Sequence, residues 1–157
     1  MTWARGVAEI EALLASGEME RIPHNPRLVE TLINDASKHL TSATHIASED
    51  PTGAYELAYD AMRKAAVALL AEQGLRPKST GGHVAVRDAV TAQFGGEGKA
   101  FRSFDWMRRA RNDLEYPDAD DPGVDADDVT AAIQAATSDL DFSRKLLETA
   151  ALTMFTP

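Results

Sequence analysis

Apolar residues recur at intervals of three and four along every long segment of this chain, and this spacing constrains its fold most. In an α-helix such spacing places the apolar side chains on one face, whereas a half-buried strand needs strict alternation. We find no convincing strand pattern. The chain has 157 residues, enough for one domain with a sizeable core. The sequence therefore predicts an all-α bundle of antiparallel helices joined by short connections.

Two pairs of residues mark where long helices begin. Asn25 and Asp50 are favoured N-cap residues. Pro26 and Pro51 suit the first helical position, because the N–H that proline lacks would have no partner there. We expect the second of these helices to stop at Gly74. Further helices are expected over residues 2–15, 83–94, 99–115 and 125–154.

These helices amount to five main ones and a short N-terminal one. We expect residues 1–49 to form a helical extension that packs on a bundle of residues 50–157, the two together making one compact domain. In the last helix, apolar residues alternate three and four apart for about four heptads. Such a seam can pack against several short helices or against a second chain, and the sequence leaves both possibilities open.

The composition excludes several kinds of site. The chain has no cysteine, which rules out disulfides and thiolate zinc sites, and its four histidines lack the spacing of metal ligands. We therefore expect no metal and no cofactor. The N-terminus has no basic start followed by an apolar run, and the longest strongly apolar stretch is far too short to span a membrane. We expect a cytoplasmic protein.

Charge is distributed unevenly along the chain. Residues 62–111 carry ten Lys and Arg against four Asp and Glu, although the whole chain has a net charge of −9. The ratio is four against ten in residues 1–61 and two against eleven in residues 112–157. A basic middle fits an anion-binding surface on an acidic protein. The acidic ends can equally neutralise the middle by packing beside it.

The segment most informative about function is RRARNDLEYP, residues 108–117, near the end of a predicted helix. At about 100° per residue, one face of this helix is apolar and is expected to be core. That face carries Trp106, Met107, Ala110 and Leu114. The opposite face carries the polar side chains Arg108, Arg111, Asn112, Glu115 and Tyr116.

Two interpretations of this polar face stay open. In the first, Arg108, Arg109 and Arg111 repel one another, and a bound phosphate or carboxylate relieves the repulsion, since the planar guanidinium suits phosphate oxygens. In the second, the helix dipole favours basic residues at the helix end and no ligand is involved. Arg111 then pairs with Glu115, and Tyr116 packs against the proline that follows it.

On these residues the chain resembles the HEPN (higher eukaryotes and prokaryotes nucleotide-binding) superfamily. Its members are small α-helical bundles, and many are metal-independent ribonucleases. The family signature is an arginine, often followed by a polar residue, and then a histidine after four to six residues. Arg111 and Asn112 match its first part. The helix ending at Gly74, the polar loop and His83 opening the next helix also resemble the family layout, over about residues 50–155.

One position departs from the signature, because Tyr116 stands five residues after Arg111 where the family usually has histidine. The resemblance implies that Arg111, aided by Arg108, holds the scissile phosphate. It implies that Asn112 orients the substrate and that Tyr116 or Glu115 moves protons. A phenol is a poor base at neutral pH, although it can donate a hydrogen bond.

The resemblance implies three alternative functions, all in a homodimer whose two copies supply the same motif. The first is an endoribonuclease of toxin or defence type that acts on single-stranded RNA. The second is a module that binds RNA or a nucleotide without turnover. The third is a protein that pairs with an antitoxin or a nucleotidyltransferase-like partner. We rank a nucleic-acid-directed role before partner binding, and a purely structural bundle last.

Overall fold

The computed structural model describes residues 3–96, 99–121 and 123–156. Within these residues the chain forms six helices and one small sheet, which confirms the all-α prediction. The elements are α1 (Val7–Ser16), β1 (Met19–Arg21), α2 (Pro26–Ile46), α3 (Pro51–Glu72), β2 (Leu75–Pro77), α4 (Gly82–Phe94), α5 (Phe104–Glu115) and α6 (Ala126–Glu148).

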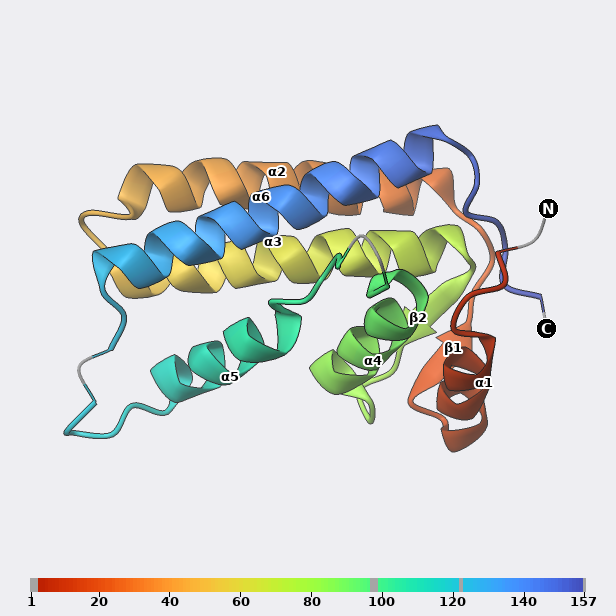
Figure 1. Cartoon of the computed structure of the whole chain (residues 1–157), viewed down its shortest axis with the longest axis horizontal. Coiled ribbons are helices and arrows are strands. Elements are labelled where there is room, and N and C mark those ends of the chain that lie inside the picture. Colours follow the sequence, from red (N-terminus) through yellow and green to blue (C-terminus); the bar gives the residue numbers. More distant parts are fainter. Residues whose placement is uncertain (1–2, 97–98, 122, 157) are drawn as a thin grey trace.

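The three longest helices, α2, α3 and α6, lie side by side (Figure 1). Helix α3 contacts α2 and α6, and it also contacts α4, α5 and β2. Helices α4 and α5 lie on the same side of α3, away from α2 and α6, and α1 packs against α4 (Figure 1). One stretch of α3 therefore faces two shorter helices, and the polar residues considered below gather there.

Helix α3 is buried on most of its circumference. Seven of its twelve buried residues are alanines, whose small side chains let α2 and α6 approach closely. A helix that is apolar on nearly all sides belongs in the centre of a bundle. The apolar seam of α6 packs against α3 in the same chain. In the described residues no helix is long and apolar enough to cross a membrane.

The helix starts that local chemistry predicts are confirmed. The side chain of Asn25 accepts the backbone N–H of Arg27 at 3.1 Å, and that of Asp50 accepts the N–H of Gly53 at 2.9 Å. At the start of α6, Asp125 and Asp128 accept each other's backbone N–H at 2.8 and 3.0 Å. These bonds satisfy N–H groups that have no partner inside the helix.

The prediction that the chain has no strand is wrong. Residues 19–21 and 75–77 pair as an antiparallel two-stranded sheet, although both segments lie between the helices that the sequence predicts. Each strand has three residues, and only its first, Met19 or Leu75, is both apolar and buried. Alternation cannot be recognised over so short a segment.

Three predicted helix ends also need correction, each at a residue with left-handed backbone. Helix α1 starts after Gly6 (φ 67°); the predicted start, Thr2, lies outside the described residues. Helix α5 starts at residue 104 rather than 99, because Lys99 and Phe101 have φ of 49° and 61°. Helix α6 ends at residue 148 rather than 154, and Ala150 has φ of 54°.

The chain after α6 turns back onto the bundle instead of continuing the helix. Leu152 and Phe155 are buried, and the N–H of Phe155 donates to the carbonyl of Gln73 at 2.9 Å. Met154, which the heptad pattern placed in the seam, is 42% exposed. Burial of two large apolar side chains in this tail stabilises it more than another helical turn would.

Candidate functional site

Two of the three arginines in the 108–117 segment pair with the same carboxylate within the chain. Asp105, one turn earlier on α5, lies 3.0 Å from Arg108, 2.9 Å from Arg109 and 2.6 Å from Arg87 of α4. Hydrogen bonds from Arg87 and Arg108 hold the pKa of Asp105 below its usual value. Asp105 therefore already offsets part of the repulsion between Arg108 and Arg109, which in one of the two interpretations an external anion would relieve.

Arg111 has a different environment. It lines a hollow of about 540 Å³, here called the Arg111 crevice, together with residues of α3 and with His83 of α4. Its guanidinium donates to Glu115, one turn further along α5, at 2.7 Å. The Arg111 side chain is 27% exposed, so it is largely covered where α5 meets α3 and α4, although the helical wheel places it on the face opposite the apolar one.

A tyrosine and a histidine meet at the crevice. The hydroxyl of Tyr59 on α3 lies 2.7 Å from Nδ1 of His83, and the two ring centres are 5.5 Å apart. The Tyr59 ring is buried and packs edge-on against Phe104 at the start of α5. Burial raises the pKa of Tyr59 to about 12, so the phenol stays protonated. This residue thus connects α3, α4 and α5.

The segment that leads into α4 is held in place by backbone groups of Gly17 and Glu18. The N–H of Lys78 donates to the carbonyl of Glu18 at 2.9 Å, and the hydroxyl of Thr80 donates to the carbonyl of Gly17 at 3.0 Å. At Gly81 a Cβ would lie 2.6 Å from the Glu18 carbonyl oxygen, so only glycine fits there. These contacts fix the segment that carries His83.

Three carboxylates and two guanidinium groups line the crevice, namely Asp50, Glu56 and Asp60 with Arg63 and Arg111. Asp60 lies 2.7 Å from Arg63 and 3.5 Å from Lys64, all on α3, and 2.9 Å from Nδ1 of His39 on α2. Partial burial raises the pKa of Asp60, but the hydrogen bond and charge of Arg63, together with the charge of Lys64 and the nearby His39, outweigh burial and bring the pKa below its usual value. Asp60 therefore holds Arg63 at the crevice wall as an ionised carboxylate.

The same surroundings keep His83 neutral. Burial disfavours its charged form most, and the positive charges of Arg63 and Arg111 add to this effect, so its pKa lies below the usual value. A neutral imidazole beside two guanidinium groups can exchange a proton near neutral pH. The arrangement combines anion binding with acid–base chemistry.

The other residues of the segment lie outside this arrangement. Asn112 is exposed, and Tyr116, 81% exposed, neither lines the crevice nor packs against a neighbour that would bury its ring. On the face predicted to be core, Met107 is buried but Trp106 is 47% exposed. The reason is that α5 lies at the edge of the fold, where its main contacts are with α3 and α4.

Sequence reasoning did not identify four of the crevice residues as site residues: Tyr59, Asp60, Arg63 and His83. These residues lie on α3 and α4, whereas Arg111 lies on α5, so they are distant from Arg111 in the sequence. The available signal was on α3, where Asp60, Arg63 and Lys64 interrupt a helix that is otherwise mostly apolar. Such an interruption in a central helix indicates a polar contact or a site.

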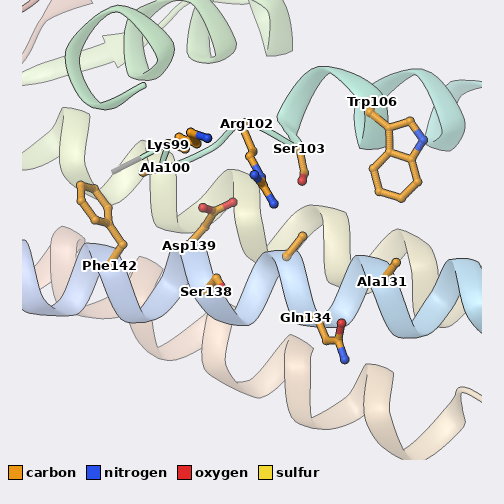
Figure 2. A pocket seen from close by; sticks show the side chains of 11 residues that line it. Lys99, Ala100, Arg102, Ser103, Trp106, Ala131, Gln134, Ser138, Asp139 and Phe142 are labelled. Carbon is orange, nitrogen blue, oxygen red and sulfur yellow. The ribbon is translucent and has the colours of Figure 1, made fainter. Parts of the chain in front are cut away.

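A second hollow, the Trp106 groove of about 570 Å³, lies between residues 99–103 and α6 (Figure 2). Figure 2 shows Asp139 of α6 and Arg102 pointing toward each other, with Trp106 at the far end. Asp139 is 6% exposed, and it accepts the N–H of Phe101 at 2.9 Å. It thereby anchors the loop before α5. The residues lining this groove include no histidine, so we place the candidate site at the Arg111 crevice.

The groups of the crevice that point to a ligand are its two guanidinium groups, which can bind an anion. Across residues 3–96, 99–121 and 123–156, no three or more histidine, aspartate or glutamate side chains are arranged to hold a metal ion. The cations lining the crevice are guanidinium groups, which bind phosphate and carboxylate oxygens in pairs. The crevice lies within a single chain, and what a second copy would add to it stays a prediction.

Comparison with curated proteins and with solved structures finds no match. Comparison with family models finds one over residues 29–146, described as the HEPN domain. The match begins within α2, ends within α6 and includes every residue of the Arg111 crevice named above. The division of the chain at residue 49 stays a prediction. Because this match covers three quarters of the chain, the protein belongs to the HEPN domain family.

Proposed function

We propose that this protein binds single-stranded RNA through its phosphates at the Arg111 crevice and cleaves it without a metal ion. The observation that carries the proposal is that Arg63 and Arg111, from two different helices, line one polar crevice in a protein of net charge −9. Two guanidinium groups at one place can bind an anionic ligand, and such a ligand must be held there beside the carboxylates Asp50, Glu56 and Asp60, which also line the crevice.

The geometry suits a phosphodiester. Two guanidinium groups on different walls can each donate two N–H bonds to phosphate oxygens. Arginines held in this way also stabilise the extra negative charge that develops on phosphorus oxygens when the ester is attacked. Unpaired RNA is the expected substrate, because its backbone can enter a narrow crevice while its bases splay apart.

In the free protein both arginines already have carboxylate partners, Asp60 for Arg63 and Glu115 for Arg111. The RNA phosphate therefore exchanges with Glu115, whose side chain is 39% exposed and free to leave. Exposed ion pairs contribute only ~0.2–1 kcal/mol, so this exchange costs little. Binding is expected to weaken as salt is raised, because cations on the RNA are released when phosphates bind.

The test is a cleavage assay with the full chain in EDTA, using a labelled single-stranded RNA and a DNA of the same sequence. We expect cleavage of RNA alone, with 2′,3′-cyclic phosphate ends, since the attacking 2′-hydroxyl is absent from DNA. Cleavage that requires added Mg²⁺, or equal cleavage of the DNA, would argue against the proposal. Absence of both cleavage and salt-sensitive binding would reject it.

A second candidate is a partner-binding module without turnover. It is favoured by the Arg111–Glu115 pair, which occupies the motif arginine in the free protein, and by the absence of a histidine after Arg111. An antitoxin or nucleotidyltransferase-like partner that presents a carboxylate or phosphate would then replace Glu115. Salt-sensitive RNA binding without cleavage, together with co-purification of such a partner, would favour this function over the first.

A further inference from the structure

We propose that His83 is the proton-transfer residue of the Arg111 crevice and replaces, from another helix, the histidine missing after Arg111. The inference rests on the proposed ribonuclease function. The motif on α5 supplies the arginine, but its own turn offers only Glu115 and Tyr116 for proton transfer. Glu115 is paired with Arg111, and Tyr116 is 81% exposed.

The first argument is position. His83 and Arg111 line the same crevice although they come from α4 and α5. His83 sits in the first turn of α4, which the contacts at Gly81 and Thr80 fix in place. A group that moves protons must be held within reach of the reacting oxygen, and a fixed imidazole beside the phosphate-binding arginine meets that requirement.

The second argument is the hydrogen bond to Tyr59. This bond occupies Nδ1 of His83, so Nε2 is the ring nitrogen available to a ligand in the crevice. In the tautomer that we propose, Nδ1–H donates to the Tyr59 oxygen, so that Nε2 carries the lone pair and acts as the base. Tyr59 is itself fixed by Phe104, so it holds the imidazole orientation much as a carboxylate does in other acid–base sites. Tyr59 is thus a positioning residue, and His83 is the catalytic one.

The third argument is charge. Four charged side chains face His83 from the two neighbouring helices. They are Asp60 and Arg63 on α3 and Arg108 and Arg111 on α5. The three arginines and burial together outweigh Asp60 and lower the pKa of His83. The imidazole is therefore neutral and able to accept a proton at pH 7, and a bound phosphate would offset the arginine charges as the proton arrives.

The reaction then balances as follows. Nε2 of His83 takes the proton of the 2′-hydroxyl while O2′ forms a bond to phosphorus. The P–O5′ bond breaks, its electron pair stays on O5′, and O5′ takes a proton from water. The hydroxide left by that water accepts the proton from the His83 imidazolium. The products are a 2′,3′-cyclic phosphate and a 5′-hydroxyl, and the imidazole is neutral again.

The main experiment compares His83→Asn with His45→Asn, an exposed control on α2. Asparagine places an amide near the Nδ1 position, so it can keep the bond to Tyr59 but cannot transfer a proton. With labelled single-stranded RNA in EDTA, we expect His83→Asn to lower kcat by about 100- to 10,000-fold with KM changed by less than about threefold. His45→Asn is expected to match the wild type. Circular dichroism checks folding, and His83→Gln replaces the first variant if that one unfolds.

A pH profile separates a catalytic from a structural role. Wild-type kcat/KM, which reports the free protein, is expected to rise with pH along a limb whose midpoint lies below about 6.5, the value of an ordinary histidine. Arg63→Gln removes a charge that lowers the pKa of His83, so its limb should move to higher pH. If the pH limb of Arg63→Gln has the same midpoint as that of the wild type, the role of His83 is overturned. The same holds if His83→Asn keeps the kcat of the wild type. Either result leaves the proposed function standing.

A ligand titration tests the residue without turnover. Uridine 3′-monophosphate is added to the full chain, and the histidine ring signals are followed by NMR and assigned with His83→Asn. The phosphate should shift the His83 signal and raise its pKa, because a nearby negative charge favours imidazolium. A bound nucleotide that leaves His83 unchanged overturns the inference. Wild-type protein that binds RNA but never cleaves it overturns the proposed function as well.

Discussion

Replacing Arg111 with alanine is expected to lower the rate of RNA cleavage by about 100- to 1,000-fold, the usual cost of removing one group that stabilises transition-state charge. The side chain forms part of the crevice wall and its only hydrogen bond within the described residues is to Glu115. Loss of this half-exposed pair should change the free energy of unfolding by less than ~1 kcal/mol. The measurement is kcat and KM in EDTA together with a urea unfolding curve.

The matched control is Arg76→Ala. Arg76 also pairs with a glutamate, Glu20, with its Nε 2.8 Å from the carboxylate, but across the small sheet and not at the crevice. Both substitutions remove one arginine and one ion pair, so only a role in phosphate binding separates them. Arg111→Lys keeps the charge but loses the planar fork and should fall between wild type and alanine. Equal cleavage by Arg111→Ala and Arg76→Ala would remove Arg111 from the site.

Glu115→Gln distinguishes two roles for the carboxylate beside Arg111. If Glu115 only competes with RNA for Arg111, its neutralisation should tighten RNA binding by about two- to fivefold, the equivalent of an exposed ion pair. If Glu115 is the base, as the family resemblance allowed, the same change should instead lower kcat by about 100-fold or more. The Arg111–Glu115 bond at 2.7 Å leads us to expect the first result.

Those parts of the fold that depend on contacts between residues close together in the sequence could be predicted. Asn25, Asp50 and Asp125 cap their helices through side chains a few residues away, so local chemistry determines where α2, α3 and α6 begin. The two strands and the late start of α5 depend on distant contacts. The loop before α5 is held by Asp139, 38 residues further along the chain from Phe101, and no local pattern predicts that bond.

The site divides in the same way. Arg111 could be identified because the Arg-Asn pair is a short contiguous motif on one helix. His83 and Tyr59 could not, since their relation to Arg111 exists only once α3, α4 and α5 are packed together. The helical wheel also misplaced Arg108 and Arg111, because it assumed that α5 has one buried face. At the edge of the fold, α4 and α3 also cover Arg108 and Arg111, whereas Asn112 and Tyr116 on the same side stay exposed.

Asp139→Asn is expected to stabilise the protein at neutral pH and to have little effect in acid. Burial raises the pKa of Asp139 from 3.8 to about 6, although the N–H of Phe101 and the charge of Arg102 act in the opposite direction. A folded-state pKa above the unfolded value means that the folded protein binds the proton more tightly. The contribution of Asp139 to stability is therefore greatest below pH 4, falls as pH rises to about 6, and stays low above that.

A shift of about two pKa units corresponds to ~3 kcal/mol, which sets the upper size of the effect. Asparagine keeps an oxygen for the Phe101 N–H and has no charge to bury, so the difference between variant and wild type should grow between pH 4 and pH 6. Asp139→Ala removes that acceptor as well and should destabilise by ~1–3 kcal/mol, because Phe101 is left with an unpaired buried N–H.

Urea unfolding at a series of pH values measures this difference, with Asp141→Asn, an exposed neighbour on α6, as the matched control. The control should stay within ~0.5 kcal/mol of wild type throughout. An Asp139→Asn variant that is less stable than wild type at pH 8 would mean that the charge of Asp139 is compensated, with Arg102 as the nearest candidate cation across the Trp106 groove. The loop before α5 would then be held by an ion pair, and raising the salt concentration should weaken it, whereas the N–H bond to Phe101 would not respond to salt.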